Sequence, residues 1–449
     1  MRPLPRCALA LAALLAAAVA LPARAQGPAA GDTTLTRFLG TLSDSTDRYF
    51  GLSAAPVDTA GLDTVIMQSS RAPSRLQFGI LPTFAFNRVD GSTPGVTAHV
   101  LDAGVEPGQN GWGRLGGSIG RAAGPGRVLG NAHYTNRLFV ARQPFDLDLW
   151  AGRTTACVDP DVTPTFFTGL SALLSGEDWT HYLRNDGWRA SLGHRRGWWE
   201  VRAGWRDLLQ TPLETSAGWN LYHNALVVPW NLAAVRGRLR EAEYFATAHA
   251  PVVPLRAEVD YRTSSPRLGS DFEYRRTRVA AGLDLSLGRV ASLVPQAAYG
   301  RLTGEPLPQA SFYIGDDATM RSLPRDGRAG TGMVVAKVDL IGAQDVLTTL
   351  RVPHPAWLPL RAGAFVATCA TWGRDPNTGL VVRGVDLPDR RDFVSEVGAS
   401  LVYDSAIFGP GSFLRWSYGW PIGPTEHEGR WTITLTRALD LLAPEPVPE

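Results

Sequence analysis

Hydrophobic and polar residues alternate with a period of two along most of the chain from Leu76 onward. Between Trp188 and Leu192 apolar residues alternate with polar or small ones, and the alternation resumes after a turn, from Trp199 to Trp205. Because successive side chains of a strand point to opposite faces, this pattern predicts a hairpin with one apolar and one charged face. It predicts further strands over residues 145–149, 255–262, 279–287, 414–420 and 431–436.

Two all-β architectures alternate in this way, the soluble β-sandwich and the transmembrane β-barrel. Trp199 and Trp205, at the two ends of one apolar face, favour the barrel because aromatic rings mark both membrane boundaries. Since backbone polar groups must be paired inside a bilayer, such strands close on themselves. The sequence therefore predicts an all-β fold, a transmembrane antiparallel β-barrel over residues 76–439. At about 23 residues per strand with its connection, this span gives about 16 strands.

The two ends of the chain differ from this pattern. Arg2 and Arg6 precede an apolar run that ends in the small-x-small sequence Ala23-Arg24-Ala25, which predicts a removable signal peptide over residues 1–25. We expect residues 26–75 to form a short periplasmic segment with an amphipathic helix, because apolar residues recur at helical spacing within 32–50. Residues 440–449 are rich in Pro and Glu, which predicts a disordered tail.

Composition and motifs argue against several function classes. The formal net charge of +2 becomes −1 once three signal arginines are removed, which excludes a strongly basic nucleic-acid binder. Cys157 and Cys369 remain, and the sequence leaves open whether they pair. Matches to the dinucleotide fingerprint at 111–116 and the nucleophile elbow at 116–120 lack the strand-turn-helix context that these motifs need. We expect no catalytic residues, no metal and no cofactor; a hydrolase site assembled in space ranks last.

One segment carries a family resemblance. Residues 312–323 read Phe-Tyr-Ile-Gly-Asp-Asp-Ala-Thr-Met-Arg-Ser-Leu and resemble the sixth-loop motif of the BamA/TamA-like bacterial surface antigen barrels. In that family an aromatic residue and a Gly-Gly pair precede an aliphatic-Arg-Gly-aromatic tip, which folds into the lumen. The resemblance implies that Gly315, Met320 and Arg321 form the loop-tip motif.

The acidic partner of the tip arginine is missing from its family position. The family's Phe-x-Asp-x-Gly reads Phe365-Val366-Ala367-Thr368-Cys369 in this chain. Asp339 is then the candidate lumen partner for Arg321.

Other pieces follow in the family's order. Residues 86–91 resemble the opening strand of family barrels that lack periplasmic POTRA repeats, and residues 396–400, 411–421 and 429–435 resemble the last three strands. About 50 residues between signal and barrel are too few for one POTRA module. The resemblance implies 16 strands and a seam between the first and last strands that opens sideways. Its edges would include Phe86, Asn87, Arg88, Gly91, Trp431, Ile433 and Leu435.

These features together predict a bacterial outer-membrane protein of the surface antigen type, not an enzyme, that inserts or translocates proteins or lipids. We expect outer-membrane lipid around the strands, unfolded outer-membrane proteins or lipids as clients, no nucleic acid, and a monomer. The alternative is a passive channel or structural outer-membrane barrel without assembly activity.

Overall fold

A computed structural model gives the fold. It describes residues 76–102, 111–159, 161, 169, 172–173, 178, 180–217, 231, 234–250, 253–316, 318–355, 358–376, 388–389, 392–404, 412–422, 428–437 and 440–442. The predicted signal peptide, the segment 26–75 with its helix, and residues 443–449 lie outside the described residues. None of the helices within the described ranges is long and apolar enough to cross a membrane.

Antiparallel strands make up almost all of the described structure. The strands are β1 (Leu76–Asn87), β2 (Gly91–Asp102), β3 (Arg114–Ala122), β4 (Arg127–Val140), β5 (Gln143–Cys157), β6 (Tyr182–Arg196), β7 (Trp199–Pro212), β8 (Gly237–His249), β9 (Leu255–Ser264), β10 (Tyr274–Leu283), β11 (Leu285–Ser286), β12 (Ala291–Gly304), β13 (Phe312–Ile314), β14 (Arg328–Gly330), β15 (Gly332–Asp345), β16 (Leu360–Trp372), β17 (Val394–Asp404), β18 (Ser412–Ile422) and β19 (Arg430–Arg437). The described residues also contain the short helices η1 (Pro266–Leu268), η2 (Pro308–Ala310) and α4 (Val346–Thr349).

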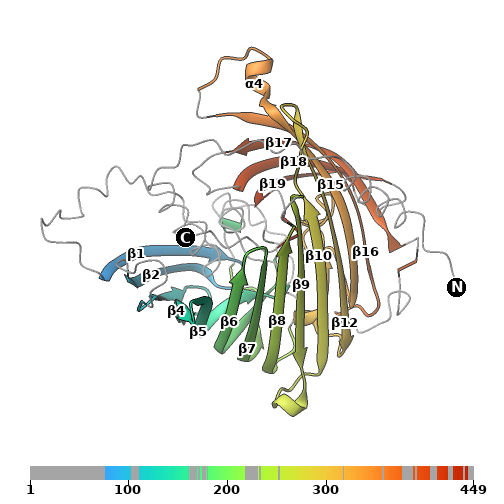
Figure 1. Cartoon of the computed structure of the whole chain (residues 1–449). Helices are drawn as coiled ribbons and strands as arrows, with labels where there is room; N and C mark the ends of the chain where they lie inside the picture. The colour runs from blue at the N-terminus through green and yellow to red at the C-terminus, as the bar shows by residue number, and fades with distance from the viewer. Residues whose placement is uncertain are drawn as a thin grey trace, which may run out of the picture.

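Each long strand pairs with the next one along the chain, so the sheet is a meander that curves around a lumen (Figure 1). The main sheet contains 17 strands. The two-residue β11 continues β10 after Asp284, since both pair with β12, which leaves 16 strand positions. This confirms the predicted all-β fold and strand number. Among the described residues no pairing joins β1 to β19, the first and last strands of the sheet.

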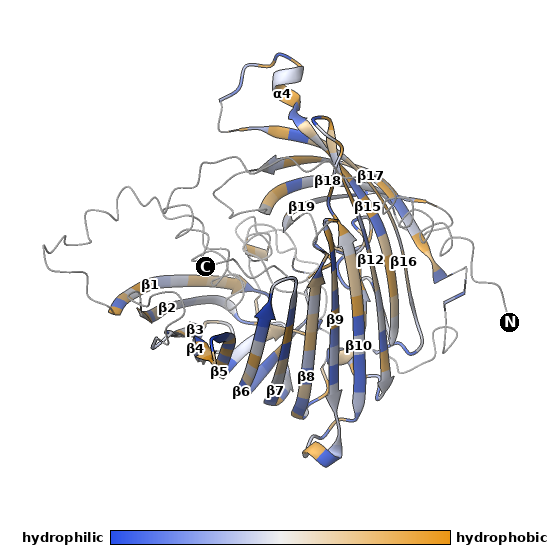
Figure 2. Ribbon diagram, viewed as in Figure 1, coloured by the Kyte–Doolittle hydropathy of each residue, from blue (hydrophilic) through white to orange (hydrophobic). Residues whose placement is uncertain are grey.

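The two faces of the sheet are inverted relative to a water-soluble protein. On β9 the alternate residues Arg256, Glu258, Asp260 and Arg262 are buried toward the lumen, whereas Val259 is 41% exposed on the outside. On β19, Trp431 is 67% exposed. Figure 2 shows hydrophilic and hydrophobic residues alternating along the strands. Charged residues inside and apolar residues outside are the arrangement of a barrel whose outer face meets lipid.

The connections differ in length at the two ends of the sheet. At one end, which we call the loop end, the connections include residues 158–181, 213–236, 305–331 and 373–393. At the other, the turn end, residues 141–142 and 197–198 form two-residue turns, and the connections 103–113 and 346–359 are longer, though each is shorter than the four connections named for the loop end. The turn at 197–198 belongs to the hairpin of β6 and β7, which was predicted and is confirmed; Gly197 provides the positive φ of +58° that such a turn requires.

Candidate functional site in the barrel lumen

The connection 305–331, here called the inner loop, lies inside the barrel and contains η2, β13 and β14. Phe312, Met320 and Leu323 of this loop are almost completely buried and belong to the largest apolar cluster of the lumen. Phe312 packs on β12 at Gly300, where a Cβ atom would lie 2.5 Å from the Phe312 ring. The guanidinium of Arg276 lies 4.2 Å from the centre of the same ring. The loop is therefore docked against the wall by apolar and cation–π contacts.

Arg321 at the tip of the inner loop is held by three neighbouring strands. Its guanidinium lies 3.0 Å from Asp339 on β15 and 4.0 Å from the centre of the Phe365 ring on β16. Its backbone N–H donates to Glu396 on β17 at 3.0 Å, and the N–H of Ser322 donates to the same carboxylate at 2.6 Å. Both the charge and the backbone of the tip are thereby fixed.

Asp339 is shared between two buried arginines. Arg415 on β18 also approaches its Oδ1 at 3.0 Å. Asp339 pairs in register with Phe365 on the neighbouring strand. In the family pattern the acid follows that phenylalanine two positions later, where this chain has Ala367. The structure thus places the acid on the adjacent strand, beside the same aromatic ring, so that it still reaches the arginine.

Gly315 and the residue after it shape the tip of the loop. Gly315 has a φ of +115°, and a Cβ atom there would lie 2.0 Å from the carbonyl oxygen of Pro324, so only glycine fits. Asp316 stands where the family has a second glycine. Its carboxylate accepts hydrogen bonds from the N–H of Thr319 at 2.8 Å and the Thr319 hydroxyl at 2.7 Å. An Asx-type turn therefore replaces the glycine pair.

The inner loop also connects the two ends of the sheet. Arg430, the first residue of β19, donates to the carbonyl of Leu323 at 3.1 Å. On the other side, Arg325 donates to the hydroxyl of Thr180 at 2.9 Å. The carbonyl of Thr180 in turn accepts from Arg88, in the turn after β1, at 2.6 Å. A continuous chain of polar contacts thus runs from β19 through the loop to the end of β1.

The predicted seam residues divide into two groups. Trp431, Ile433 and Leu435 do lie on β19, the last strand. On the other side, Phe86 and Asn87 lie at the end of β1, the first strand. Residues 88–90 form the β1–β2 turn, in which the side chain of Asn87 accepts from the N–H of Val89 and Asp90 at 3.0 and 2.8 Å. Gly91 begins β2, which is paired on both sides. The prediction that Arg88 and Gly91 lie on the seam edge was therefore wrong, because this local turn ends β1 at Asn87.

Arg88 points into the connection 158–181 at the loop end. Its backbone N–H donates to Asp178 at 3.1 Å, and its guanidinium lies 2.9 Å from Nδ1 of His181. Burial, reinforced by the charge of Arg88, lowers the pKa of His181 to about 4. The imidazole is therefore neutral at pH 7 and can accept a hydrogen bond from the guanidinium.

The chain after β19 turns back into the lumen. Asp440 accepts from the amide of Gln296 at 3.0 Å and forms an ion pair with Lys337. Leu441 and Leu442 are buried in the main apolar cluster. These three residues differ from the predicted disordered tail 440–449, because the acid finds a cation and an amide, and the two leucines find an apolar surface.

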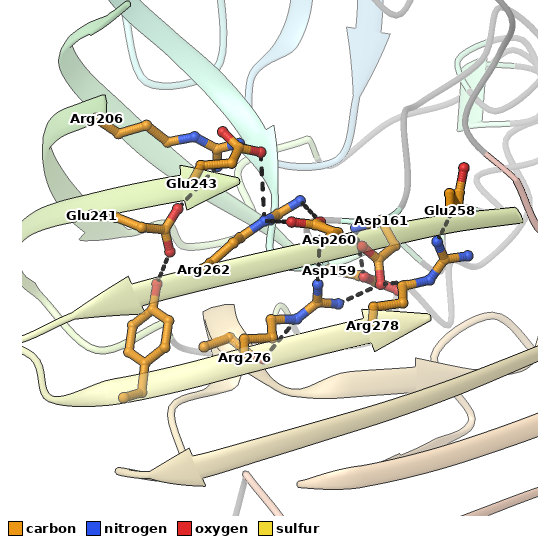
Figure 3. A network of polar contacts seen from close by, with 12 residues as sticks. Asp159, Asp161, Arg206, Glu241, Glu243, Glu258, Asp260, Arg262, Arg276 and Arg278 are labelled. Atoms are coloured by element: carbon orange, nitrogen blue, oxygen red, sulfur yellow. Dashed lines mark hydrogen bonds and ion pairs between the residues drawn. The ribbon is translucent and has the colours of Figure 1, made fainter. Parts of the chain in front are cut away.

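A second polar network lines the wall formed by β7 to β10 (Figure 3). Arg206 contacts Glu243 at 2.6 Å, and Arg262 contacts Asp260 at 2.6 Å. Asp161, in the connection after β5, is bound by Arg276. Burial alone would raise the pKa of Asp161, but Arg276 and neighbouring arginines hold it well below its usual range. The carboxylate is therefore ionised and attaches this connection to the wall.

Sequence reasoning named Asp339 as a partner for Arg321, and the structure places the two in contact. It missed the roles of Glu396, Arg415, Lys337 and Asp440. The alternation of residues could have indicated Glu396, Arg415 and Lys337, because each stands at a position of its strand that faces the lumen. Cys157 and Cys369, whose pairing the sequence left open, are both free thiols.

No protein-family model matches this sequence, and no curated protein matches it either. Among solved structures, the BamA barrel of Haemophilus ducreyi lacking POTRA domains 1–3 aligns over 79% of this chain and 69% of its own, at 12% identity and a TM-score of 0.47. CdiB from Acinetobacter baumannii aligns over 80% and 59%, at 11% identity and a TM-score of 0.40. CdiB from Escherichia coli aligns over 81% and 62%, at 10% identity and 0.43. This chain therefore spans about six tenths of the CdiB chains, and likeness at this level assigns neither a family nor a function.

Proposed function

We propose that this protein is an integral β-barrel of the bacterial outer membrane. The observation that carries the proposal is the inverted sheet, with ionised residues buried in the lumen and large apolar residues exposed outside. In water such an outer face would be costly to expose, whereas lipid solvates it. The predicted signal peptide supports export. Because long connections of such barrels face the cell exterior, we assign the loop end to the outside.

We infer that the barrel acts, without enzymatic chemistry, in inserting or translocating proteins or lipids across a seam between β1 and β19. Three observations support this role: the lack of a described pairing between these strands, the resemblance of residues 312–323 to the surface antigen loop motif, and the contacts by which the inner loop links β19 to the β1–β2 turn. A client strand that pairs with the edge of β1 or β19 would extend the sheet by one strand.

Membrane fractionation with gel electrophoresis tests the barrel itself. Membrane β-barrels keep their compact fold in detergent until they are heated, and in this chain each long strand is hydrogen-bonded to the next one along the chain. We expect the protein in the outer-membrane fraction and a faster-running band when the sample is not boiled. A soluble protein without a heat-dependent shift would refute the membrane location.

A disulfide across the seam tests the inferred role. In a background with Cys157→Ala and Cys369→Ala, one cysteine replaces Ile433 on β19, and a second scans the outward positions 78, 80 and 82 of β1. The control joins Trp416→Cys to Ile433→Cys, which are already paired neighbours on β18 and β19. Oxidation of a seam pair should stop insertion of an outer-membrane protein into vesicles, and reduction should restore it. Full activity in the oxidised seam variant would exclude opening at this seam.

A passive channel is the second candidate, because the lumen contains a cavity of about 420 Å³ lined by both polar and apolar residues. Its lining includes Asn131, Gln210, Arg206 and Glu241, together with Trp150. The inner loop fills other parts of the lumen. Deletion of residues 314–324 should raise single-channel conductance if the loop only narrows a pore. Loss of insertion activity without a change in conductance would favour the seam role.

A further inference from the structure

The outer face of the sheet carries a cluster of arginines near the loop end, here called the arginine belt. Strand register places these residues on the same face as the exposed apolar side chains. For example, Arg153 pairs with Asp186, and Ala151 pairs with the exposed Trp188 on the same face. Arg301 stands two residues from the exposed Tyr299. The belt consists of Arg121, Arg153, Arg184, Arg238, Arg240, Arg275 and Arg301.

All belt residues lie close to the loop end of their strands. Arg121 is the penultimate residue of β3, and Arg275 is the second residue of β10. Arg153 is the furthest from the end of its strand, because it lies four residues before Cys157, the last residue of β5. The belt therefore lies at the loop end of the apolar outer surface, where the exposed Val128 and Leu209 still pair with Arg121 and Arg238. In a barrel that spans a membrane, this level is the boundary between hydrocarbon and headgroups.

Two acidic residues on this face neutralise only part of the belt. Arg153 contacts Asp186 at 2.6 Å, and Asp207 is shared by Arg238 at 2.7 Å and Arg240 at 3.1 Å. These two aspartates pair with three of the seven arginines, and Asp271, in the connection between β9 and β10, accepts from the backbone N–H of Arg238 at 2.6 Å, so the arginines of the belt outnumber these acids. The side chains of Arg153 and Arg238 are each 52% exposed, so they are accessible from the membrane boundary.

Arginine suits one class of ligand at this position. Its planar fork donates two parallel hydrogen bonds to a phosphate group, and it is more weakly hydrated than lysine. Long arginine side chains can also extend along apolar surface while the charge reaches the headgroup level. Phosphate-bearing lipids provide the matching anions at the level where the apolar band ends.

We propose that the arginine belt binds the phosphate groups of anionic lipids in the membrane leaflet at the loop end. This inference rests on the proposed membrane-spanning barrel and adds its lipid partner. Bound phosphates would fix the height and tilt of β3 to β12 in the bilayer. The belt lies on the strands away from β1 and β19, so it would anchor one wall while the seam stays free to move.

A competition experiment tests the belt. The triple variant Arg121→Gln, Arg184→Gln, Arg275→Gln removes three belt charges. The control Arg142→Gln, Arg195→Gln, Arg196→Gln removes the same charge at the turn end. Each protein is released from mixed micelles with equal amounts of phosphatidylglycerol and phosphatidylcholine, and native mass spectrometry gives the ratio of the two lipids retained. A parallel arm adds excess inorganic phosphate.

The wild type and the control should retain phosphatidylglycerol in preference to phosphatidylcholine. In the belt variant the ratio of phosphatidylglycerol to phosphatidylcholine should fall at least about fivefold, because one surface arginine near anionic lipid contributes a factor of about five. Equal ratios in all three proteins would overturn the proposal, and so would displacement of the lipid by inorganic phosphate. All proteins are first checked for the outer-membrane fraction and the heat-dependent band. A wild type that fails this check refutes the membrane location, whereas one that passes it without lipid preference refutes only the belt.

Discussion

Replacing Asp339 by Asn removes the carboxylate that two buried guanidinium groups share. Arg321 and Arg415 each lie 3.0 Å from its Oδ1, and they are 2% and 0% exposed. Removing one partner of a buried ion pair leaves an uncompensated charge and costs about 3–5 kcal/mol. The amide oxygen of Asn still accepts a hydrogen bond, and Arg321 keeps its contact with Phe365. We therefore expect a loss near ~3 kcal/mol, the lower end of that range.

Unfolding in detergent micelles measures this loss. The fraction of the faster-running unboiled band is followed against guanidinium chloride, and the shift in midpoint gives the change in the free energy of unfolding. Asp186→Asn is the matched control, because its ion pair with Arg153 lies on the outer face with side chains 31% and 52% exposed. A pair of that kind contributes less than about 1 kcal/mol. If both variants lose the same small amount, the Asp339 cluster does not stabilise the barrel.

A second-site change separates the ion pair from a general packing defect. Ala367 faces the lumen two residues after Phe365, at the position of the acid in the family pattern. Adding Ala367→Asp to Asp339→Asn returns a carboxylate to the neighbourhood of Arg321. The double variant should recover at least half of the lost stability. No recovery would mean that Arg321 needs an acid on β15 itself.

Three further outcomes follow from the contacts in the lumen. Asp440→Ala should lower the denaturant midpoint by an amount equivalent to about 2–3 kcal/mol, because it leaves buried Lys337 without this ion pair. An unchanged midpoint would show that Asp440 does not stabilise the barrel. Gly300→Val should undock the inner loop, since its side chain would collide with Phe312, and limited proteolysis should then cut within 305–331, which should stay protected in the wild type; equal protection of both proteins would contradict this. The pKa of His181 in the folded protein, about 4, lies below its unfolded value near 6.5. The neutral imidazole therefore contributes its full stability above pH 6.5, and this contribution is lost as the pH falls toward 4. His181→Asn should remove this part of the pH dependence of the denaturant midpoint, and a pH profile identical to that of the wild type would contradict the assignment.

The alternation of residue types determined much of this structure before any contact was known. Because the side-chain period of a strand is two, the run from Leu255 to Arg262 specifies one apolar and one charged face. The pattern also indicates which face meets lipid, since large apolar side chains with terminal aromatics stand opposite ionised ones. The loop-tip residues Gly315 and Arg321 could be identified by their resemblance to the surface antigen loop motif, and Asp339 was named as the substitute for the acid that the family pattern lacks in this chain.

Local sequence also misled at one point. Residues 86–91 were assigned to the opening strand, and Phe86 and Asn87 do lie on β1. The side chain of Asn87 then gives residues 88–90 a turn, and Gly91 takes the positive φ of +66° that follows it. Short-range hydrogen bonding of this kind competes with strand pairing. The first strand therefore ends before Arg88, and the seam edge on that side lies earlier in the chain.

Apart from the pair Arg321 and Asp339, the members of the lumen clusters became known only from the tertiary structure. Asp339 meets Arg415 because β15 and β18 curve around the same lumen, and 76 positions separate the two residues in the chain. Asp440 reaches Lys337 only because the chain turns inward after β19. The sequence by itself determined the strands, their two faces and the arginine at the loop tip, since these follow from local periodicity and motif. Which charges meet in the lumen was decided by strand register and sheet curvature, because both arise only when distant strands pair.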